Sequence, residues 1–374
     1  MMAGIPATGT TIGAVTGGLR LGPDGSFRPN LRWELSERGA VLDATGCWIT
    51  PGFVDAHSHL AWSDFDAADR PTGTAERAAG AAANQLATLR AGVTVVRDAG
   101  GYDLALARRL AGRAGPRASL SVDIIGAADA RGERHLRDRV AELADAGAAW
   151  IKLAATGGVG AGTRQLEPVF SPGELAAVMG AAATAGLPVM VHAWGGPALD
   201  QVVDLGAASI EHAVFLTAAQ AARIAACGAF VVPTVWIYAD VLRLASTGVL
   251  PRTLAPAARR AVAAHPRALR HCLDAGVRLA AGTDAGLASQ HGRNLHEVAA
   301  MIDAGVPAPL ALAAATTAGL ALVGEAASRG DLVVFSGDPG RPDVLRDRAA
   351  VRAVLQGGRV VHSRSDAGSG TEAG

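Results

Sequence analysis

The sequence of 374 residues has few charged side chains, few aromatic side chains and almost no cysteine. Charged residues make up 18% of the chain, against about 25% in an average soluble domain, while hydrophobic residues make up 50%. Such a chain can bury a large core, which excludes global disorder. The 34 basic and 34 acidic side chains cancel. No excess positive charge therefore favours a nucleic acid or an anionic membrane surface as a partner.

The three cysteines, Cys47, Cys227 and Cys272, are far apart and form no C-x-x-C pair. This spacing supports neither a disulfide framework nor a thiolate zinc site. The N-terminal segment lacks a basic flank followed by an apolar core, and the chain lacks an apolar run long enough for a membrane span. We therefore expect a cytoplasmic protein. We expect its partner to be a small molecule, and the sequence leaves open whether the chain forms a homo-oligomer.

Lysine is the scarcest charged residue, because 33 arginines accompany a single lysine, Lys152. Arginine replaces lysine on a solvated face at little cost. Its guanidinium never loses its proton in a protein, however, and so cannot supply a neutral, nucleophilic amine. The single exception therefore indicates that position 152 needs the chemistry of an amine.

From about residue 52 to 324, short apolar runs alternate with Ala-rich helical stretches, which is the pattern of a β/α protein. Several of the predicted strands follow a glycine that ends the preceding helix. The eight predicted strands are 52–59, 93–98, 119–125, 148–154, 188–193, 208–213, 229–235 and 277–284. This repetition predicts an α/β fold of the (β/α)8 TIM-barrel type rather than an open doubly wound sheet.

The two flanks differ from this pattern. Short strand-like pieces separated by Gly, Pro and Asn fill residues 1–50, and two or three more occur in 325–362, where paired glycines mark a hairpin. We expect these two segments to form a small β-sandwich beside a barrel of residues 51–324. The small polar residues 363–374 predict a disordered tail.

Candidate metal ligands close five of the predicted strands, at the end where barrels of this type carry their active sites. The spacing of His57 and His59 directs both imidazoles to one face of the first strand. The other candidates end the fourth, fifth, sixth and eighth strands and are Lys152, His192, His212 and Asp284. A single histidine at such a place is more often a hydrogen-bonded core residue. The joint pattern instead predicts a metal site.

Other polar and aromatic residues allow two interpretations. The tryptophans beyond strands one, five and seven either wall a substrate pocket or seal the loop layer, and two polar residues beyond strand eight either contact substrate or are solvated. These candidates are Trp62, Trp194, Trp236, His291 and Arg293. The glycine cluster 157–162 lacks the spacing of a dinucleotide-binding loop and is interpreted as a flexible loop. Four further histidines, in helical or terminal segments, are interpreted as surface residues and are His135, His265, His271 and His362.

The ordered segments PGFVDAHSH, IKLAATGG, VHAWG, SIEHA, GTDAG and DLVVFSGDP resemble the amidohydrolase superfamily, metal-dependent hydrolases built on a distorted barrel. The resemblance implies that His57, His59 and Asp284 hold one divalent cation and that His192 and His212 hold a second. It also implies that Lys152 bridges both as a carbamate formed with carbon dioxide. A shared hydroxide is then the nucleophile, and Asp284 passes its proton to the leaving nitrogen. The imidazole-rich donor set favours Zn²⁺.

Within that superfamily the chain is most similar to prolidase-like and imidazolonepropionase-related members, which hydrolyse acyl-amino acids, dipeptides or cyclic amides. The resemblance implies an amide C–N hydrolase in which Tyr238 contacts the substrate. The segment between the third and fourth strands is short, however, and lacks the insertion with which prolidase-like members help to grip a substrate carboxylate. A free α-carboxylate in the substrate is therefore not expected.

Three alternatives stay open. A mononuclear deaminase of a heterocycle resembles this chain in its HxH pair and final aspartate, but would carry a glutamate a few residues after His192, where the sequence reads VHAWGGPALD. Glu211 precedes His212, and strand alternation turns it away from the barrel mouth. A lactonase or esterase uses the same binuclear site with an oxygen leaving group. A non-catalytic scaffold conflicts with six chemically competent ligand positions.

Overall fold

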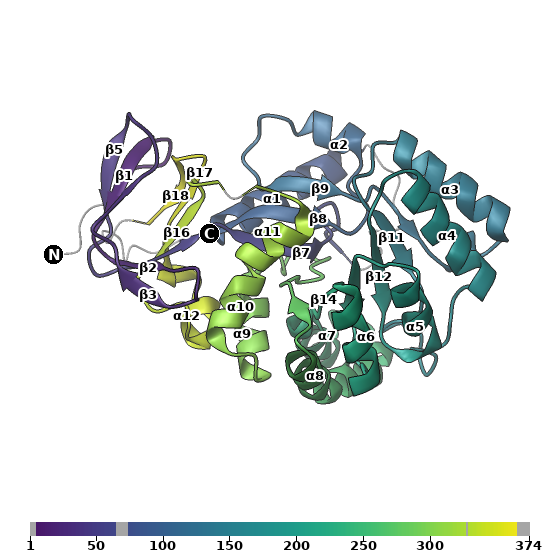
Figure 1. The fold of residues 1–374 in the computed structure, drawn as a ribbon. Coiled ribbons are helices and arrows are strands. Elements are labelled where there is room, and N and C mark those ends of the chain that lie inside the picture. The colour runs from purple at the N-terminus through teal and green to yellow at the C-terminus, as the bar shows by residue number, and fades with distance from the viewer. Residues whose placement is uncertain (1–4, 65–73, 327, 365–374) are drawn as a thin grey trace.

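The computed structural model describes residues 5–64, 74–326 and 328–364. Most of the tail predicted at 363–374 lies outside the described residues, which end at Arg364. None of the described helices is long and apolar enough to cross a membrane. Figure 1 shows inner strands flanked by helices over most of the molecule and mainly strands at one end.

Two parallel sheets carry the middle of the chain. The smaller sheet contains β7 (Phe53–Ser58), β8 (Val93–Asp98) and β9 (Arg117–Leu120). The larger contains, in spatial order, β10 (Ile124–Ile125), β11 (Ile151–Ala154), β12 (Val189–Ala193), β13 (Ser209–His212), β14 (Phe230–Val232) and β15 (Arg278–Leu279). Every residue of β8 is buried, as expected for a parallel strand that is covered on both faces. Its bounds confirm the predicted strand 93–98.

Backbone hydrogen bonds continue between the two sheets. The Ala56 N–H donates to the Ala281 carbonyl at 2.8 Å, and the Ser121 N–H donates to the Asp98 carbonyl at 3.1 Å. The first predicted strand therefore lies beside the segment that follows β15. The third predicted strand is divided into β9 and β10, because Val122 between them has a φ of 67°, a left-handed conformation that interrupts a strand.

Helices alternate with the parallel strands, as the apolar periodicity predicts, and lie outside them (Figure 1). Those between β7 and β13 are α1 (Ala75–Arg90), α2 (Leu104–Arg109), α3 (Glu133–Asp145), α4 (Pro172–Thr184) and α5 (Gly196–Asp204). Those after β13 are α6 (Ala218–Cys227), α7 (Val235–Ser246), α8 (Ala255–Ala275), α9 (Leu295–Asp303), α10 (Ala308–Ala314), α11 (Thr317–Val323) and α12 (Pro342–Arg346). Local signals set their ends. At the start of α4, for example, Ser171 and Glu174 form a capping box.

The two ends of the chain share one sheet of order β18-β17-β16-β6-β2-β3, beside a second of order β4-β1-β5. Their strands are β1 (Ile12–Thr16), β2 (Leu19–Leu21), β3 (Phe27–Pro29), β4 (Arg32–Glu34), β5 (Ala40–Asp43), β6 (Trp48–Pro51), β16 (Leu332–Phe335), β17 (Val351–Gln356) and β18 (Arg359–Ser363). Figure 1 shows these purple and yellow strands together. The positive φ angles of Gly357 and Gly358 form the predicted hairpin between β17 and β18.

Candidate metal centre and catalytic cavity

Four of the predicted ligand residues meet directly where the strands end. His57 lies in β7, His59 just after it, Lys152 in β11, and Asp284 after β15. The His57 Nε2 atom is 3.2 Å from Lys152 Nζ and 3.2 Å from the Asp284 Oδ1 atom. The same carboxylate oxygen is 3.3 Å from His59 Nε2. Residues that are far apart in the sequence thus bring two imidazoles, an amine and a carboxylate together.

The other two predicted ligands, His192 at the end of β12 and His212 at the end of β13, lie beside this group. Their ring centroids are 4.4 Å apart, and the His212 ring is 5.2 Å from the His57 ring. All six side chains therefore gather at one rim.

Each of the four histidines in this group uses one ring nitrogen in a hydrogen bond within the protein. These contacts are His57 Nδ1 to Glu211 Oε2 at 2.7 Å, His59 Nδ1 to the Gly100 carbonyl at 3.0 Å, His192 Nε2 to the Gly157 carbonyl at 2.9 Å, and His212 Nδ1 to Thr234 Oγ1 at 2.8 Å. Carboxylate and carbonyl oxygens only accept, so three of these imidazoles donate there. In neutral rings, this leaves the second nitrogen with a lone pair, as in metal-binding histidines.

The chemistry of these donors fits a cation. Burial lowers the pKa of His59, although the nearby Asp284 acts to raise it, which favours a neutral ring. Ligand atoms of His57, His59 and Asp284 all lie within 4.8 Å of one another. Two imidazole nitrogens and a carboxylate oxygen at this spacing are donor types that a divalent cation takes. The three residues therefore form a group that can hold a metal ion.

Burial has opposite consequences for the two charged residues of the rim. It lowers the pKa of Lys152 to about 8, although Glu211 and Asp284 act to raise it. A neutral amine is therefore accessible near physiological pH. Burial also acts to raise the pKa of Asp284, but His57 and His59 outweigh it and hold that pKa well below its usual range. The Asp284 side chain is thus an ionised carboxylate, the form that binds a cation.

A buried ion pair contacts His57 through a hydrogen bond. The sequence analysis did not predict this pair. Arg97 of β8 and Glu211 of β13 are fully buried, with 3.0 Å between Arg97 Nη2 and Glu211 Oε1. Burial acts to raise the pKa of Glu211, but the charge of Arg97 and the His57 hydrogen bond lower it to about 2. Glu211 is not among the residues that line the cavity, and it acts on the site through its hydrogen bond with His57. The sequence did contain a signal for Arg97, because it is a charged residue within the apolar run VTVVRD.

Backbone conformation at the rim is unusual. His212, Thr234 and Asp284 have φ angles of 73°, 50° and 56°, in the left-handed region that non-glycine residues rarely adopt. Each such residue costs about 1–3 kcal/mol and persists where the surrounding structure enforces it, often at a functional site. Two of these three residues are predicted metal ligands, which supports the assignment of this rim as the site.

A cavity of about 330 Å³ opens above the rim. His59, His192 and Asp284 line its floor, and Trp62 stacks on the His59 ring with centroids 3.8 Å apart. Its other lining residues are mainly apolar and are Asp64, Val159, Ile237, Tyr238, Val241, Leu250, Gly286, Leu287 and Gln290. No lysine or arginine belongs to the lining among the residues that the structure describes. The cavity therefore suits an uncharged, largely apolar group.

The structure places Trp62 and Tyr238 in this lining but not the other four candidate substrate contacts. Trp194 is fully buried behind Tyr238, with ring centroids 5.1 Å apart. Trp236 packs on His296 instead. His291 is buried and its Nε2 donates to the Trp62 carbonyl at 3.3 Å. The fourth, Arg293, lines a different pocket.

Two interpretations from the sequence need correction. His265 is not a surface residue but is 1% exposed, and its Nε2 atom lies 3.2 Å from the His212 carbonyl. It supports the strand end that carries His212. The loop at 157–162 is also more than a flexible connection, because the Gly157 carbonyl orients His192 and Val159 lines the cavity. Neither tertiary contact has a signal in local sequence spacing.

Gly282, two residues before Asp284, lies tightly between β7 and β14. A Cβ atom there would be 2.5 Å from Val232 Cγ1 and 2.7 Å from His57 Cβ. We expect Gly282→Ala to lower the free energy of unfolding by about 1–3 kcal/mol through overpacking. Denaturant unfolding measures the change. The matched control is Gly180→Ala in α4, where a Cβ meets nothing within 4 Å. The control should unfold at or above the wild-type midpoint, and equal loss in both variants would contradict the packing argument.

Comparison with known proteins agrees with this architecture. The model of the amidohydrolase family matches residues 48–361. An uncharacterized protein of Mycobacterium tuberculosis is 29% identical over 328 residues, covering 82% of this chain and 84% of the relative. An imidazolonepropionase of Acidiphilium cryptum is 31% identical over 266 residues, covering 59% and 65%. The crystal structure of a prolidase complexed with N-methylphosphonate-L-proline superposes with a TM-score of 0.84 at 26% identity, covering 94% and 99%.

Proposed function

The chain belongs to the amidohydrolase family, and from that premise we propose that it is a hydrolase of amide C–N bonds with a binuclear metal centre. The convergence of His57, His59, Lys152 and Asp284 carries the proposal. We assign His57, His59 and Asp284 to one divalent cation, and His192 and His212 to a second. The imidazole-rich donor set favours Zn²⁺ for both.

In this proposal Lys152 carries a carbamate whose oxygen atoms would help to hold both cations. Its neutral Nζ atom bonds to the carbon of carbon dioxide and releases one proton, which creates two anionic oxygen atoms that share one negative charge. The burial of Lys152 supports this role, because a buried ammonium is disfavoured. No arginine can take the role, which explains why this position alone carries lysine in a chain of 33 arginines.

When bound, such cations supply a hydroxide nucleophile near neutral pH and polarise the scissile carbonyl. The protein positions the reactants. Asp284, whose side chain is 27% exposed and lines the cavity, accepts the proton of the nucleophile and delivers it to the leaving nitrogen. Trp62 and Tyr238 contact the substrate from the cavity wall. The stacking of Trp62 on His59 keeps one side of the cavity closed to water.

We infer further that the preferred amides are neutral and apolar. The described lining offers no lysine or arginine to pair with a carboxylate that lies away from the metal centre. A carboxylate placed against this wall would lose its hydration without gaining a basic partner, which costs free energy. The wall formed by Ile237, Val241 and Leu287 instead favours an aryl or alkyl group.

Two matched substrates test this function. N-Benzoyl-phenylalaninamide and N-benzoyl-phenylalanine differ only in their terminal amide and carboxylate. We expect the metal-loaded protein to hydrolyse an amide bond of the neutral compound with a kcat/KM at least about tenfold higher. Removal of the metals by a chelator should abolish turnover, and zinc should restore it. Elemental analysis should find two metal ions per chain.

A preference for the carboxylate-bearing compound would refute the neutral substrate class while leaving amide hydrolysis intact. Turnover that survives complete metal removal would refute the metal-dependent mechanism. Hydrolysis confined to lactones or other esters would show that the same site serves an oxygen leaving group. A single tightly bound metal in fully active protein would exclude the binuclear assignment.

We also propose that the two parallel sheets form one (β/α)8 barrel over residues 51–324. The hydrogen bonds between Ala56 and Ala281 and between Ser121 and Asp98 support closure at both junctions. In this division, residues 1–50 and 325–362 form a separate β-sandwich. The shared sheet in which β6 pairs with β16 supports it.

A further inference from the structure

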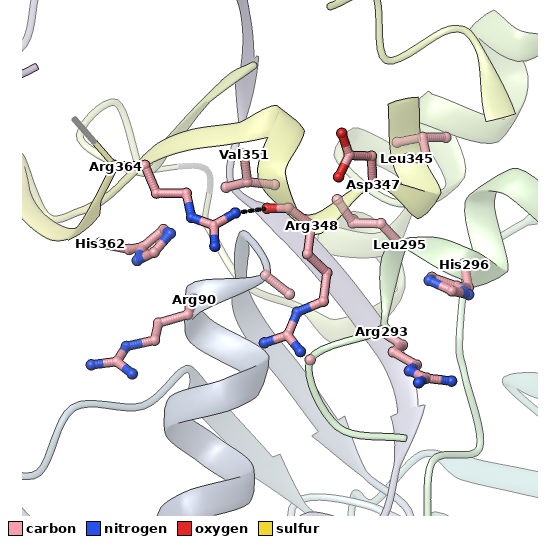
Figure 2. Close-up of a pocket in the computed structure, with 12 residues that line it drawn as sticks. Arg90, Arg293, Leu295, His296, Leu345, Asp347, Arg348, Val351, His362 and Arg364 are labelled. Carbon is pink, nitrogen blue, oxygen red and sulfur yellow. Dashed lines mark hydrogen bonds between the residues drawn. The ribbon is translucent and has the colours of Figure 1, made fainter. Parts of the chain in front are cut away.

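A second pocket, of about 280 Å³, lies away from the catalytic cavity. It is bordered by the last turn of α1, the loop before α9, the segment 347–351 and the end of β18 (Figure 2). Its basic lining residues, which we call the arginine pocket, are Arg90, Arg293, Arg348, Arg364, His296 and His362. Figure 2 shows Arg348 between Arg90 and Arg293 in this view. Side chains from four separate segments thus bring positive charge to one place.

Little of this charge is neutralised by the part of the chain that the structure describes. The pocket has one lining carboxylate, Asp347, which accepts the Ala349 N–H at 2.8 Å. None of the four arginine side chains of the pocket forms an ion pair with a carboxylate among the described residues. Arg364 instead donates from its Nη1 atom to the Arg348 carbonyl at 3.2 Å. Four guanidinium groups therefore face a single carboxylate.

Two arginines outside the pocket show the pairing that its four arginines lack. Arg346, two residues before Arg348, pairs with Asp303 on α9. Arg223 on α6 contacts both Asp200 and Asp204 on α5. Four arginines gathered in one pocket without an acidic partner among the described residues indicate that the balancing negative charge comes from a bound anion.

The pKa values of the two pocket histidines reflect the same positive charge. Burial, together with the nearby Arg364, Arg90 and Arg348, lowers the pKa of His362 to about 4. Burial together with Arg293 and Arg346 lowers the pKa of His296 to about 4 as well. Both rings are therefore neutral at physiological pH. They can donate or accept a hydrogen bond without adding to the charge repulsion.

We propose that the arginine pocket binds a small molecule that bears a phosphate or pyrophosphate group. The planar guanidinium presents paired N–H donors that match the oxygens of such an anion, and charge-assisted hydrogen bonds are stronger than neutral ones. The pocket volume admits a pyrophosphate group or a compact phosphate ester but not a folded protein segment. The ligand is therefore a metabolite-sized anion rather than a macromolecule.

This binding site is separate from the catalytic cavity. The loop between β15 and α9 contributes Gly286, Leu287 and Gln290 to the cavity and Gly292 and Arg293 to the arginine pocket. The two sites share this loop but no lining residue. The anion is thus not the substrate of the proposed amide hydrolysis, and its binding can be tested independently of turnover.

Isothermal titration calorimetry of the full-length, metal-loaded protein with inorganic pyrophosphate tests the proposal. We expect one site per chain whose affinity falls as sodium chloride is raised, because salt screens exposed charges. Arg293→Gln and Arg348→Gln should each weaken binding at least about tenfold, the loss expected for one charge-assisted hydrogen bond. The matched control Arg223→Gln removes a cation outside the pocket and should bind as the wild type does.

Metal content and thermal unfolding are measured for every variant, so that a lost metal or a lost fold is recognised. The proposal is overturned if pyrophosphate does not bind. It is equally overturned if both pocket variants bind as tightly as the control, because the anion then lies elsewhere, at the metal centre for example. Amide hydrolysis need not change in any of these variants, so either result leaves the proposed function standing.

Discussion

Lys152→Arg should abolish hydrolysis, lowering kcat by several orders of magnitude, and should release at least one metal ion per chain. The substitution keeps the positive charge and the approximate length of the side chain but removes the amine that forms a carbamate. A permanent cation then occupies the place where Lys152 Nζ is 3.2 Å from His57 Nε2. Repulsion between this guanidinium and two dications dismantles the centre that generates the nucleophile. Elemental analysis and steady-state kinetics measure the two effects.

Two further variants separate the carbamate from a merely structural lysine. Lys152→Ala leaves space instead of charge, so formate or acetate should restore part of the activity by supplying the bridging carboxylate. Arg223→Lys, the control, exchanges the same two residue types at an exposed ion pair and should keep both metals and full activity. A Lys152→Arg variant with both metals and near-normal turnover would rule out the bridge and revive the mononuclear alternative.

The sequence predicts strands reliably where apolar runs are continuous and bounded by clear turns. The predicted strand 93–98 coincides with β8, because VTVVRD is buried throughout and follows a glycine turn. The predicted strand 119–125 is interrupted at Val122, whose left-handed φ is imposed by its tertiary surroundings and not by its side chain. The local sequence is thus enough to predict that a strand exists here. Whether the strand continues without interruption depends on tertiary contacts.

In the site, too, some features could be predicted from the local sequence and others depend on tertiary contacts. Regular placement of His57, His59 and Asp284 at strand ends was enough to predict that they meet, because parallel strands end at one edge. The direction of Arg293 was not predictable, since loop residues have no fixed periodicity, and it lines the arginine pocket. The buried pair of Arg97 and Glu211 was missed because each charge is costly alone and reasonable only beside the other.

Glu211→Gln should lower the free energy of unfolding by about 3–5 kcal/mol, the cost of breaking one side of a buried ion pair. Arg97 is fully buried and holds three strands, donating to the Ala56 carbonyl at 2.7 Å and to Ser209 Oγ at 2.9 Å. Without the carboxylate its charge stays in the core without a partner. Denaturant unfolding measures the loss. The exposed control Glu133→Gln, which removes the partner of Arg137 on α3, should unfold as the wild type does.

A double-mutant cycle distinguishes the charge from simple loss of packing. Arg97→Met alone removes the cation and leaves Glu211 buried and ionised beside His57, so it should also destabilise strongly. Arg97→Met combined with Glu211→Gln leaves neither charge, and its loss should be smaller than the sum of the two single losses. The double variant should still show reduced turnover, because His57 Nδ1 then donates to an uncharged amide oxygen, which lowers the basicity of its Nε2 atom. Additive losses would mean that the pair contributes packing alone and that its charges do not interact.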